Sequence, residues 1–125
     1  MIGVQSEAAP ALHTAWSEGH LKAHDRMETF AEGVATRVPF ALTMGLLRER
    51  LDEFHLVSED TIRDGIRELL VSESIVAEGA SATSLAALRE TRERIRGKTV
   101  VFPISGRNID TAHLHDVLEG RDSSE

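Results

Sequence analysis

The spacing of hydrophobic positions changes repeatedly along this chain, from the short apolar runs of strands to the longer period of helices. Apolar runs predict three strands, which cover residues 1–5, 54–57 and 100–104. Apolar residues at i, i+3 and i+4 spacing predict helices between and after these strands. The predicted helices cover residues 6–19, 40–51, 58–70, 80–95 and 110–119. This alternation indicates an α/β fold built on a parallel sheet.

Single residues set several of the predicted boundaries. Ser6 is the predicted N-cap of the first helix, which ends near Gly19. Ser58 caps the third helix in the same way. Residues 75–77 are either a short strand or the end of a helix. In the second helix the spacing predicts one buried stripe, made of Leu42, Leu46, Leu47 and Leu51.

The last predicted strand runs directly into a serine and a glycine. Residues 100–104 are large and apolar apart from Pro103, which is typical of a strand covered on both faces. Pro103 cannot donate to a ladder, which indicates a bulge or a sheet edge at that position. Ser105 then lies at the carboxyl end of the strand, where open α/β sheets place their ligands. The competing interpretation is a turn serine whose hydroxyl bonds to its own backbone.

Charge and composition exclude several classes of function. The 125 residues suit one domain, and the net charge of −7 comes without a long basic run. Nucleic acids and anionic membranes attract clustered lysine and arginine, so neither is a predicted partner. The absence of cysteine excludes a disulfide framework, a thiolate nucleophile and a cysteine-based zinc site. No apolar run approaches the ~20 residues of a transmembrane helix, and we expect a cytoplasmic protein.

The histidines do not predict a metal site. His113 and His115 lie two positions apart on a predicted helix, so their side chains face different directions. His20 and His24 would align only if their loop were helical. We therefore expect ordinary surface histidines.

Five segments resemble, in order and spacing, the motifs of one enzyme family. Val57-Ser58-Glu59-Asp60-Thr61-Ile62 is similar to a V-S-E-x-x-I helix start. Glu78-Gly79-Ala80-Ser81-Ala82 is similar to an E-P/G-A-G/S-A helix start, and Ser105-Gly106-Arg107-Asn108-Ile109-Asp110 to S-G-G-N-[VI]-D. Residues 2–11 resemble the segment after a glycine-rich loop, and residues 29–37 a T-x-A-D-G-x-A-x-R stretch. The family is that of the threonine and serine dehydratases (threonine ammonia-lyases), pyridoxal-phosphate enzymes of the tryptophan-synthase-β-like fold, or fold type II.

The resemblance implies a partial three-layer parallel-sheet fold of the tryptophan-synthase-β type, incomplete at its N-terminus. Residues 1–120 would form the C-terminal portion of a pyridoxal-phosphate-dependent dehydratase catalytic domain, and residues 121–125 a disordered tail. Ser105, with Gly106 beside it, would bind the pyridine nitrogen of pyridoxal 5'-phosphate. Glu78 would lie near the edge of the cofactor, or form a salt bridge at its helix start. Asn108 would cap the last helix or face a neighbouring subunit.

The chain also departs from the family pattern. Arg107 stands at a position that is normally glycine, and Glu32 at one that is normally aspartate. Some relatives bind a divalent cation through carboxylates at the positions of Gln5 and Ala11, so no metal site is predicted here. The family's cofactor-binding lysine and its glycine-rich phosphate loop would both lie before Ile2. The lysines of this chain, Lys22 and Lys98, lack that motif context.

The resemblance therefore predicts a C-terminal fragment of a lyase that eliminates water from a small hydroxy amino acid, giving a 2-oxo acid and ammonia. By itself the fragment is expected to be inactive, with no catalytic residue of its own and with doubtful binding of the cofactor. The intact form is expected to be a homo-oligomer. Three alternatives stay open: a non-catalytic remnant that associates with a full-length relative, a parent of the serine racemase or hydroxyaspartate dehydratase type, and an unrelated small α/β ligand-binding domain.

Overall fold

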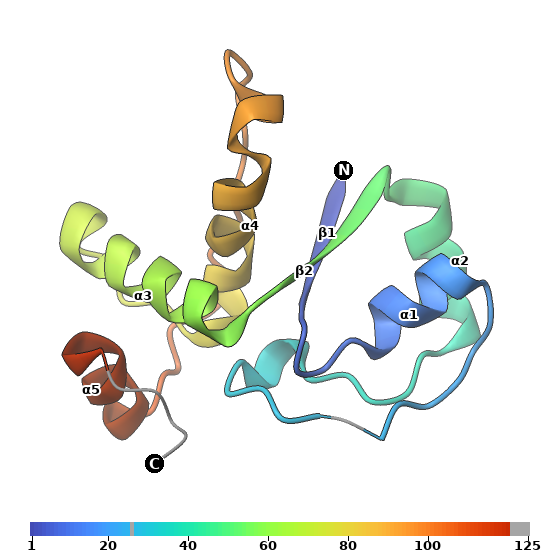
Figure 1. Cartoon of the computed structure of the whole chain (residues 1–125), viewed down its shortest axis with the longest axis horizontal. Helices are drawn as coiled ribbons and strands as arrows, with labels where there is room; N and C mark the ends of the chain where they lie inside the picture. Colours follow the sequence, from blue (N-terminus) through green and yellow to red (C-terminus); the bar gives the residue numbers. More distant parts are fainter. Residues whose placement is uncertain (26, 121–125) are drawn as a thin grey trace. The chain divides into compact units, whose positions relative to one another are not determined.

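The computed structural model describes residues 1–25 and 27–120, and the predicted tail at residues 121–125 lies outside them. The chain divides into two compact units, Met1–Glu59 and Asp60–Glu125. Figure 1 shows the helices and strands of each unit. Within the described ranges, no helix is both long and apolar enough to cross a membrane.

The first unit contains a parallel two-stranded sheet. Strand β1 (Ile2–Ser6) pairs with β2 (Glu53–Val57), with Ile2 opposite Glu53 and Ser6 opposite Val57. Helix α1 (Ala11–Glu18), the 3-10 helix η1 (Glu32–Val34) and helix α2 (Ala41–Arg50) lie between the two strands in the sequence. Both predicted strands and their parallel pairing are confirmed.

Helix α1 packs on the sheet through aromatic and small side chains. The rings of His13 and Trp16 meet the ring of Phe54 edge-on, at centroid distances of 5.6 and 6.1 Å. The prediction that Ser6 caps this helix is wrong, because α1 begins only at Ala11 and Pro10 occupies the N-cap position. The Ser6 hydroxyl instead accepts a hydrogen bond from the Ala8 amide at 2.9 Å. The serine closes the turn after β1 rather than starting a helix.

The buried stripe predicted for α2 is also wrong. Met44 is the buried residue of this helix, whereas Leu42 is 80% and Leu46 is 51% exposed. Arg48 lies one turn beyond Met44 and donates a hydrogen bond to the Ala15 carbonyl of α1 at 2.8 Å. Residues four apart share a helix face, so the face of Met44 and Arg48 is the one turned toward α1. The leucine pattern alone does not reveal this rotation.

A carboxylate at the end of the first unit joins three separate segments. Glu59 accepts hydrogen bonds from the Ser6 hydroxyl, from the Thr29 hydroxyl at 2.8 Å and from the Phe30 amide at 3.0 Å. Hydrogen bonds to a charged acceptor are stronger than neutral ones. Glu59, two residues after the end of β2, therefore holds the end of β1 and the 29–30 loop together.

The second unit is built from helices. Helix α3 (Glu59–Glu73) begins at the last residue of the first unit, and α4 (Gly79–Ile95) and α5 (Thr111–Glu119) follow it. Ile62 and Ile66 of α3 are fully buried, as the helical spacing predicts. A Cβ atom on Gly65 would lie 3.1 Å from the Ala82 carbonyl oxygen, so the backbones of α3 and α4 approach closely there.

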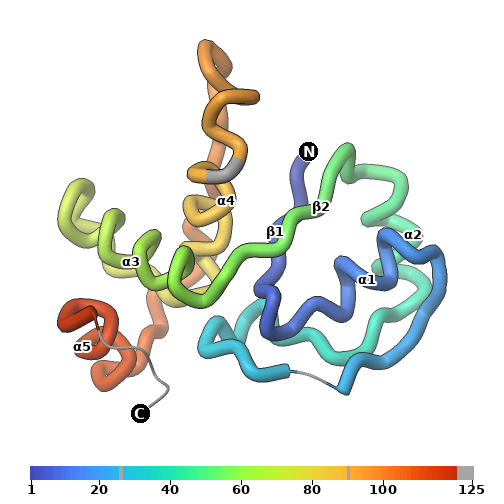
Figure 2. Tube along the Cα trace, viewed as in Figure 1, coloured from blue at the N-terminus to red at the C-terminus, as the bar shows by residue number. Residues whose placement is uncertain are grey.

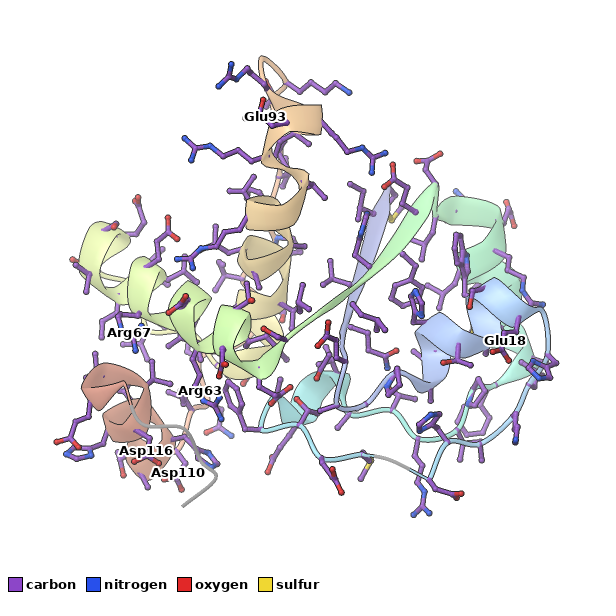
Figure 3. All side chains as sticks on the ribbon, in the orientation of Figure 1. Glu18, Arg63, Arg67, Glu93, Asp110 and Asp116 are labelled. Carbon is purple, nitrogen blue, oxygen red and sulfur yellow. The ribbon has the colours of Figure 1, made fainter. Side chains whose placement is uncertain are left out.

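Arginines join the helices of the second unit. Arg89 of α4 makes ion pairs with Asp64 at 2.6 Å and with Glu68 at 3.3 Å, both on α3. Arg67 pairs with Asp64 at 2.7 Å and donates to the Val117 carbonyl of α5. Figure 3 labels Arg67 between α3 and α5. Partly exposed ion pairs contribute little energy each, so these arginines mainly fix the positions of the helices.

The strand predicted at residues 100–104 does not form. This segment has no ladder partner in the described part of the chain, and Val101 is 84% exposed. An apolar run becomes a strand only where another strand offers hydrogen bonds. Figure 2 shows the extended trace after α4 returning toward the start of that helix.

Two further boundaries differ from the sequence-based expectation. The N-cap of α5 is Asp110, whose carboxylate accepts from the Ala112 amide at 2.7 Å, so the prediction that Asn108 caps this helix is wrong. Residues 75–77 are not a strand. Helix α3 ends at Glu73, and Ser74 then adopts a left-handed conformation with φ of 56°.

Candidate functional site

The candidate site is the turn at residues 105–108, which lies against the start of α4. The Gly106 carbonyl accepts a hydrogen bond from the Glu78 amide at 3.2 Å. Glu78 is the residue immediately before α4 and has an extended conformation. Its carbonyl accepts from the Ser81 and Ala82 amides at 3.1 and 3.2 Å, which starts the helix. The structure therefore brings together all three predicted site residues, Ser105, Gly106 and Glu78.

Ser81 of α4 holds the turn through hydrogen bonds to the Gly106 backbone. The Ser81 hydroxyl accepts from the Gly106 amide at 2.7 Å and donates to the Gly106 carbonyl at 2.9 Å. The same oxygen lies 3.2 Å from the Ser105 hydroxyl oxygen. Ser81 is buried, with 1% of its surface exposed. Ser81 therefore bonds to both backbone polar groups of Gly106.

The Glu78 carboxylate occupies the space beside Gly106. A Cβ atom at position 106 would lie inside van der Waals contact with the carboxylate carbon and oxygens of Glu78. One carboxylate oxygen also accepts from the Asn108 amide at 3.2 Å. Only glycine allows this approach without movement of Glu78, which gives Gly106 a physical reason to be glycine.

Ser105 is exposed, as are Arg107 and Asn108 of the same turn. Its hydroxyl oxygen lies 3.2 Å from that of the buried Ser81. A hydroxyl group can both donate one hydrogen bond and accept others. The turn therefore presents a neutral hydrogen-bonding group at a position held by Ser81 and Glu78.

These residues match one end of the cofactor that the resemblance implies. A single exposed hydroxyl suits the ring nitrogen of a pyridine, and the Gly106 backbone leaves room for the Glu78 carboxylate beside it. The phosphate and aldehyde ends need backbone amides and a lysine. Lys22 lies in the first unit, and Lys98 lies near the end of α4. Neither belongs to the turn described above.

Gln5, at one of the two positions where the resemblance implies a cation ligand in some relatives, bonds to backbone groups here. Gln5 is 2% exposed, and its side-chain oxygen accepts from the His13 amide at 3.0 Å. Its side-chain nitrogen donates to the Val34 carbonyl at 3.3 Å. Among the residues that the structure describes, no group of three or more histidine or acidic side chains could hold a metal ion.

Sequence reasoning missed Ser81 as a site residue. It lies inside the motif at residues 78–82, but a serine among small helix residues is usually a packing residue. The signal that was available is its place three residues after Glu78, within the first turn of α4. Only the fold shows that residues 105–106 return to this serine.

Comparison with known proteins supports the motif resemblance. A family model described as pyridoxal-phosphate dependent enzyme matches residues 1–106. The chain is 37% identical over 118 residues to L-threonine ammonia-lyase of Thermotoga maritima, which covers 94% of this chain and 29% of that protein. It is 34% identical over 119 residues to the catabolic L-threonine dehydratase of Escherichia coli, covering 94% of this chain and 36% of that protein.

Solved structures agree with these relatives. The processed form of threonine deaminase isoform 2 from Solanum lycopersicum is 29% identical, with a TM-score of 0.86 over 94% of this chain and 35% of that one. Serine racemase from Dictyostelium discoideum is 28% identical, with a TM-score of 0.77 over 87% of this chain and 35% of that one. The chain thus spans about a third of the length of the proteins it matches. Because the family model covers most of its residues, the chain belongs to the pyridoxal-phosphate dependent enzyme family.

Proposed function

We propose that this chain supplies the C-terminal part of the catalytic domain of a pyridoxal-phosphate-dependent lyase of the threonine and serine dehydratase type. The observation that carries the proposal is the exposed Ser105 hydroxyl, held by Ser81 and Gly106 within a motif that resembles S-G-G-N-[VI]-D. The similarity to an L-threonine ammonia-lyase and an L-threonine dehydratase supports the choice of a hydroxy amino acid as substrate.

In this proposal Ser105 holds the ring nitrogen of pyridoxal 5'-phosphate. When bound, this cofactor supplies an electron sink for bond cleavage at the α-carbon of an amino acid. Ser105 orients the ring through one hydrogen bond, and Gly106 lets the Glu78 carboxylate lie beside it. The overall reaction removes water from the hydroxy amino acid and gives a 2-oxo acid and ammonia.

The same residues explain why the chain is proposed to be inactive by itself. Lys22 and Lys98 are exposed and lie outside the Ser105 turn. A cofactor that binds covalently needs a lysine placed against its aldehyde carbon. The lysine and the phosphate-binding amides would come from the rest of the catalytic domain.

The first experiment uses the full chain with the cofactor. We expect no visible absorbance band of a lysine-bound cofactor and no 2-oxo acid from L-threonine or L-serine. Borohydride reduction followed by peptide mapping would then find no specific label. Stoichiometric labelling of Lys22 or Lys98, or turnover by the chain alone, would contradict the proposed inactivity.

The second experiment supplies the missing part. The segment of the Escherichia coli catabolic dehydratase that aligns with this chain is replaced by this chain, and 2-oxo acid formation is measured. We expect activity with L-threonine or L-serine that Ser105→Ala lowers about tenfold or more, the loss of one hydrogen bond of ~1.4 kcal/mol. Ser84→Ala is the matched control, because the Ser84 hydroxyl bonds within α4, to the Ser81 carbonyl at 3.1 Å.

Two results would contradict this role. A chimera that binds the cofactor but keeps its activity in Ser105→Ala would exclude Ser105 as the ring contact. A chimera that interconverts L- and D-serine without forming a 2-oxo acid would favour a parent of the serine racemase type.

A further inference from the structure

One face of helix α2 carries large apolar side chains that are exposed. Leu42 is 80% and Leu46 is 51% exposed, and Phe40, the N-cap residue, is 67% exposed. The helix buries Met44 on its opposite face, where Arg48 bonds to α1. Exposed apolar side chains that gather on one helix face are typical of a surface that binds another protein.

A glycine lies in the same exposed stripe. The stripe consists of four residues at i, i+3, i+4 and i+7 spacing, which share one helix face: Leu42, Gly45, Leu46 and Glu49. Glycine in a helix interior destabilises the helix. A Cβ atom on Gly45 would meet nothing within 4 Å in the described part of the chain, so internal packing does not require this glycine. A small residue on an exposed face does allow a second helix to approach closely.

The charges of α2 favour a second, antiparallel copy of the same helix as the binding partner. The first turn of α2 has no acidic residue, and Phe40 has no side-chain oxygen that could cap the first amides. The positive end of the helix dipole therefore lacks a matching negative charge from α2 itself. Glu49 lies at the other end of the stripe, where a negative charge is unfavourable for its own helix. Its ion pair with Arg50, at 3.3 Å, is exposed and contributes little. In an antiparallel pair, each Glu49 lies near the N-terminal end of the other copy's α2.

We propose that two copies of this chain associate through the Leu42–Leu46 face of antiparallel α2 helices, about a two-fold axis beside Gly45. The axis passes midway between Leu42 and Leu46, so Leu42 of one copy contacts Leu46 of the other. A patch that is complementary to itself in this way is what a two-fold dimer requires. The inference goes beyond the proposed function and does not depend on it, because no residue of the Ser105 turn takes part.

The first test measures association of the full chain by sedimentation equilibrium over a range of concentrations. We expect a monomer–dimer equilibrium. Leu42→Glu should raise its dissociation constant about tenfold or more, because each dimer would bury two unpaired carboxylates. Val71→Glu is the matched control, because Val71 is 74% exposed on α3, and it should leave the dissociation constant unchanged.

Substitution of Gly45 separates association from the stability of the helix. Glutamine favours a helix more than glycine does, so Gly45→Gln should raise the melting temperature of the monomer, measured in dilute solution. The longer side chain should hold the two helices apart and raise the dissociation constant about tenfold or more. Gly45→Ala keeps a small side chain and should retain the dimer.

Disulfide formation tests the direction of the two helices. The chain contains no cysteine, so a single introduced thiol reports on one position. The Leu42→Cys and Leu46→Cys variants are oxidised separately and as a mixture. Antiparallel helices bring position 42 close to position 46 of the other copy, so the mixed disulfide should form faster than either disulfide between identical chains.

Three results would overturn the proposal. A chain that stays monomeric at all concentrations has no such interface, which is the result expected if another segment or another protein covers this face. A dimer that Leu42→Glu leaves unchanged uses a different surface. Faster disulfide formation between identical chains would show parallel helices. None of these results bears on the proposed function, which is tested by Ser105→Ala and 2-oxo acid formation in the chimera.

Discussion

The two units of this chain treat an apolar run in different ways. In the first unit, β1 (Ile2–Ser6) and β2 (Glu53–Val57) pair in parallel, and Val57 is fully buried. In the second unit, residues 100–104 carry more large apolar side chains than either strand, but they form no strand and leave Val101 84% exposed. The more apolar segment is the one without a strand, and among the residues that the structure describes a ladder partner is present in the first unit alone. The difference shows that strand formation here depends on a partner strand rather than on the run itself.

The largest expected difference in the free energy of unfolding is between substitutions of Val57 and Val101. Val57→Ala should lower the free energy of unfolding by about 2–3 kcal/mol, because it removes buried methyl groups and leaves a cavity. Val101→Ala, its matched partner in the exposed segment, should change it by less than about 0.5 kcal/mol. Urea denaturation of both variants measures the contrast. Equal losses would mean that residues 100–104 are buried in solution.

A smaller effect tests how the exposed segment is held at its end. Gly106→Ala forces the Glu78 carboxylate to move and weakens its bond with the Asn108 amide, which should cost about 1–2 kcal/mol. In a Glu78→Ala background the same substitution should cost less, so a double-mutant cycle measures the coupling. Gly45→Ala is the control, because a Cβ atom there meets nothing within 4 Å. Additive energies would exclude the close approach of Glu78 and Gly106.

A stabilising change is expected at the end of α3. Ser74 has a left-handed φ of 56°, which glycine adopts without steric cost. Ser74→Gly should therefore raise the free energy of unfolding by about 0.5–1 kcal/mol after the larger chain entropy of glycine is included. Ser72→Gly, two residues earlier and inside the helix, should lower it by about 1 kcal/mol. Thermal melting should show a higher melting temperature for Ser74→Gly and a lower one for Ser72→Gly. Changes in the same direction would contradict the left-handed conformation of Ser74.

The smallest effect is a pH dependence in the first unit. Burial, and then the nearby His55, lower the pKa of His13 below its ordinary value of 6.5. The folded state therefore favours the neutral ring, so this contribution to stability is fully present above pH 6.5 and is lost as the pH falls below it. Denaturation midpoints measured on both sides of that pH should show the decrease, and His13→Gln should reduce it. His20→Gln, at an exposed ring, is the control, and an unchanged slope in His13→Gln would refute the assignment.

The spacing of apolar residues correctly predicted helix α3 and both strands of the first unit. Ile62 and Ile66 lie at helical spacing and are buried in α3, and the strands at both ends of the first unit follow their apolar runs. The rotation of α2 was not predictable, because Leu42 and Leu46 form as good a stripe as the face that includes Met44. That choice depends on the contact of Arg48 with α1, which is not visible in the spacing.

The candidate site shows the same division. The motif at residues 105–110 led to Ser105 and Gly106, and the motif at residues 78–82 led to Glu78. Ser81 was missed, because its importance comes from the return of the chain to α4, and no periodicity encodes that return. Ser105, Gly106 and Glu78 were predicted because they stand at recognisable motif positions. Ser81 could be identified only from the folded chain, where it joins the two motifs.

The carboxylate of Glu59 also sets an order of events during synthesis. Ser6, Thr29 and Phe30 all bond to Glu59, and β1 finds its only described ladder partner in residues 53–57. A ribosome makes the N-terminal partners first and the acceptor last, and contacts of such long sequence separation form slowly. The Glu59 hydrogen bonds and the β1–β2 pairing of a nascent chain therefore cannot be complete until Glu59 has left the ribosome tunnel.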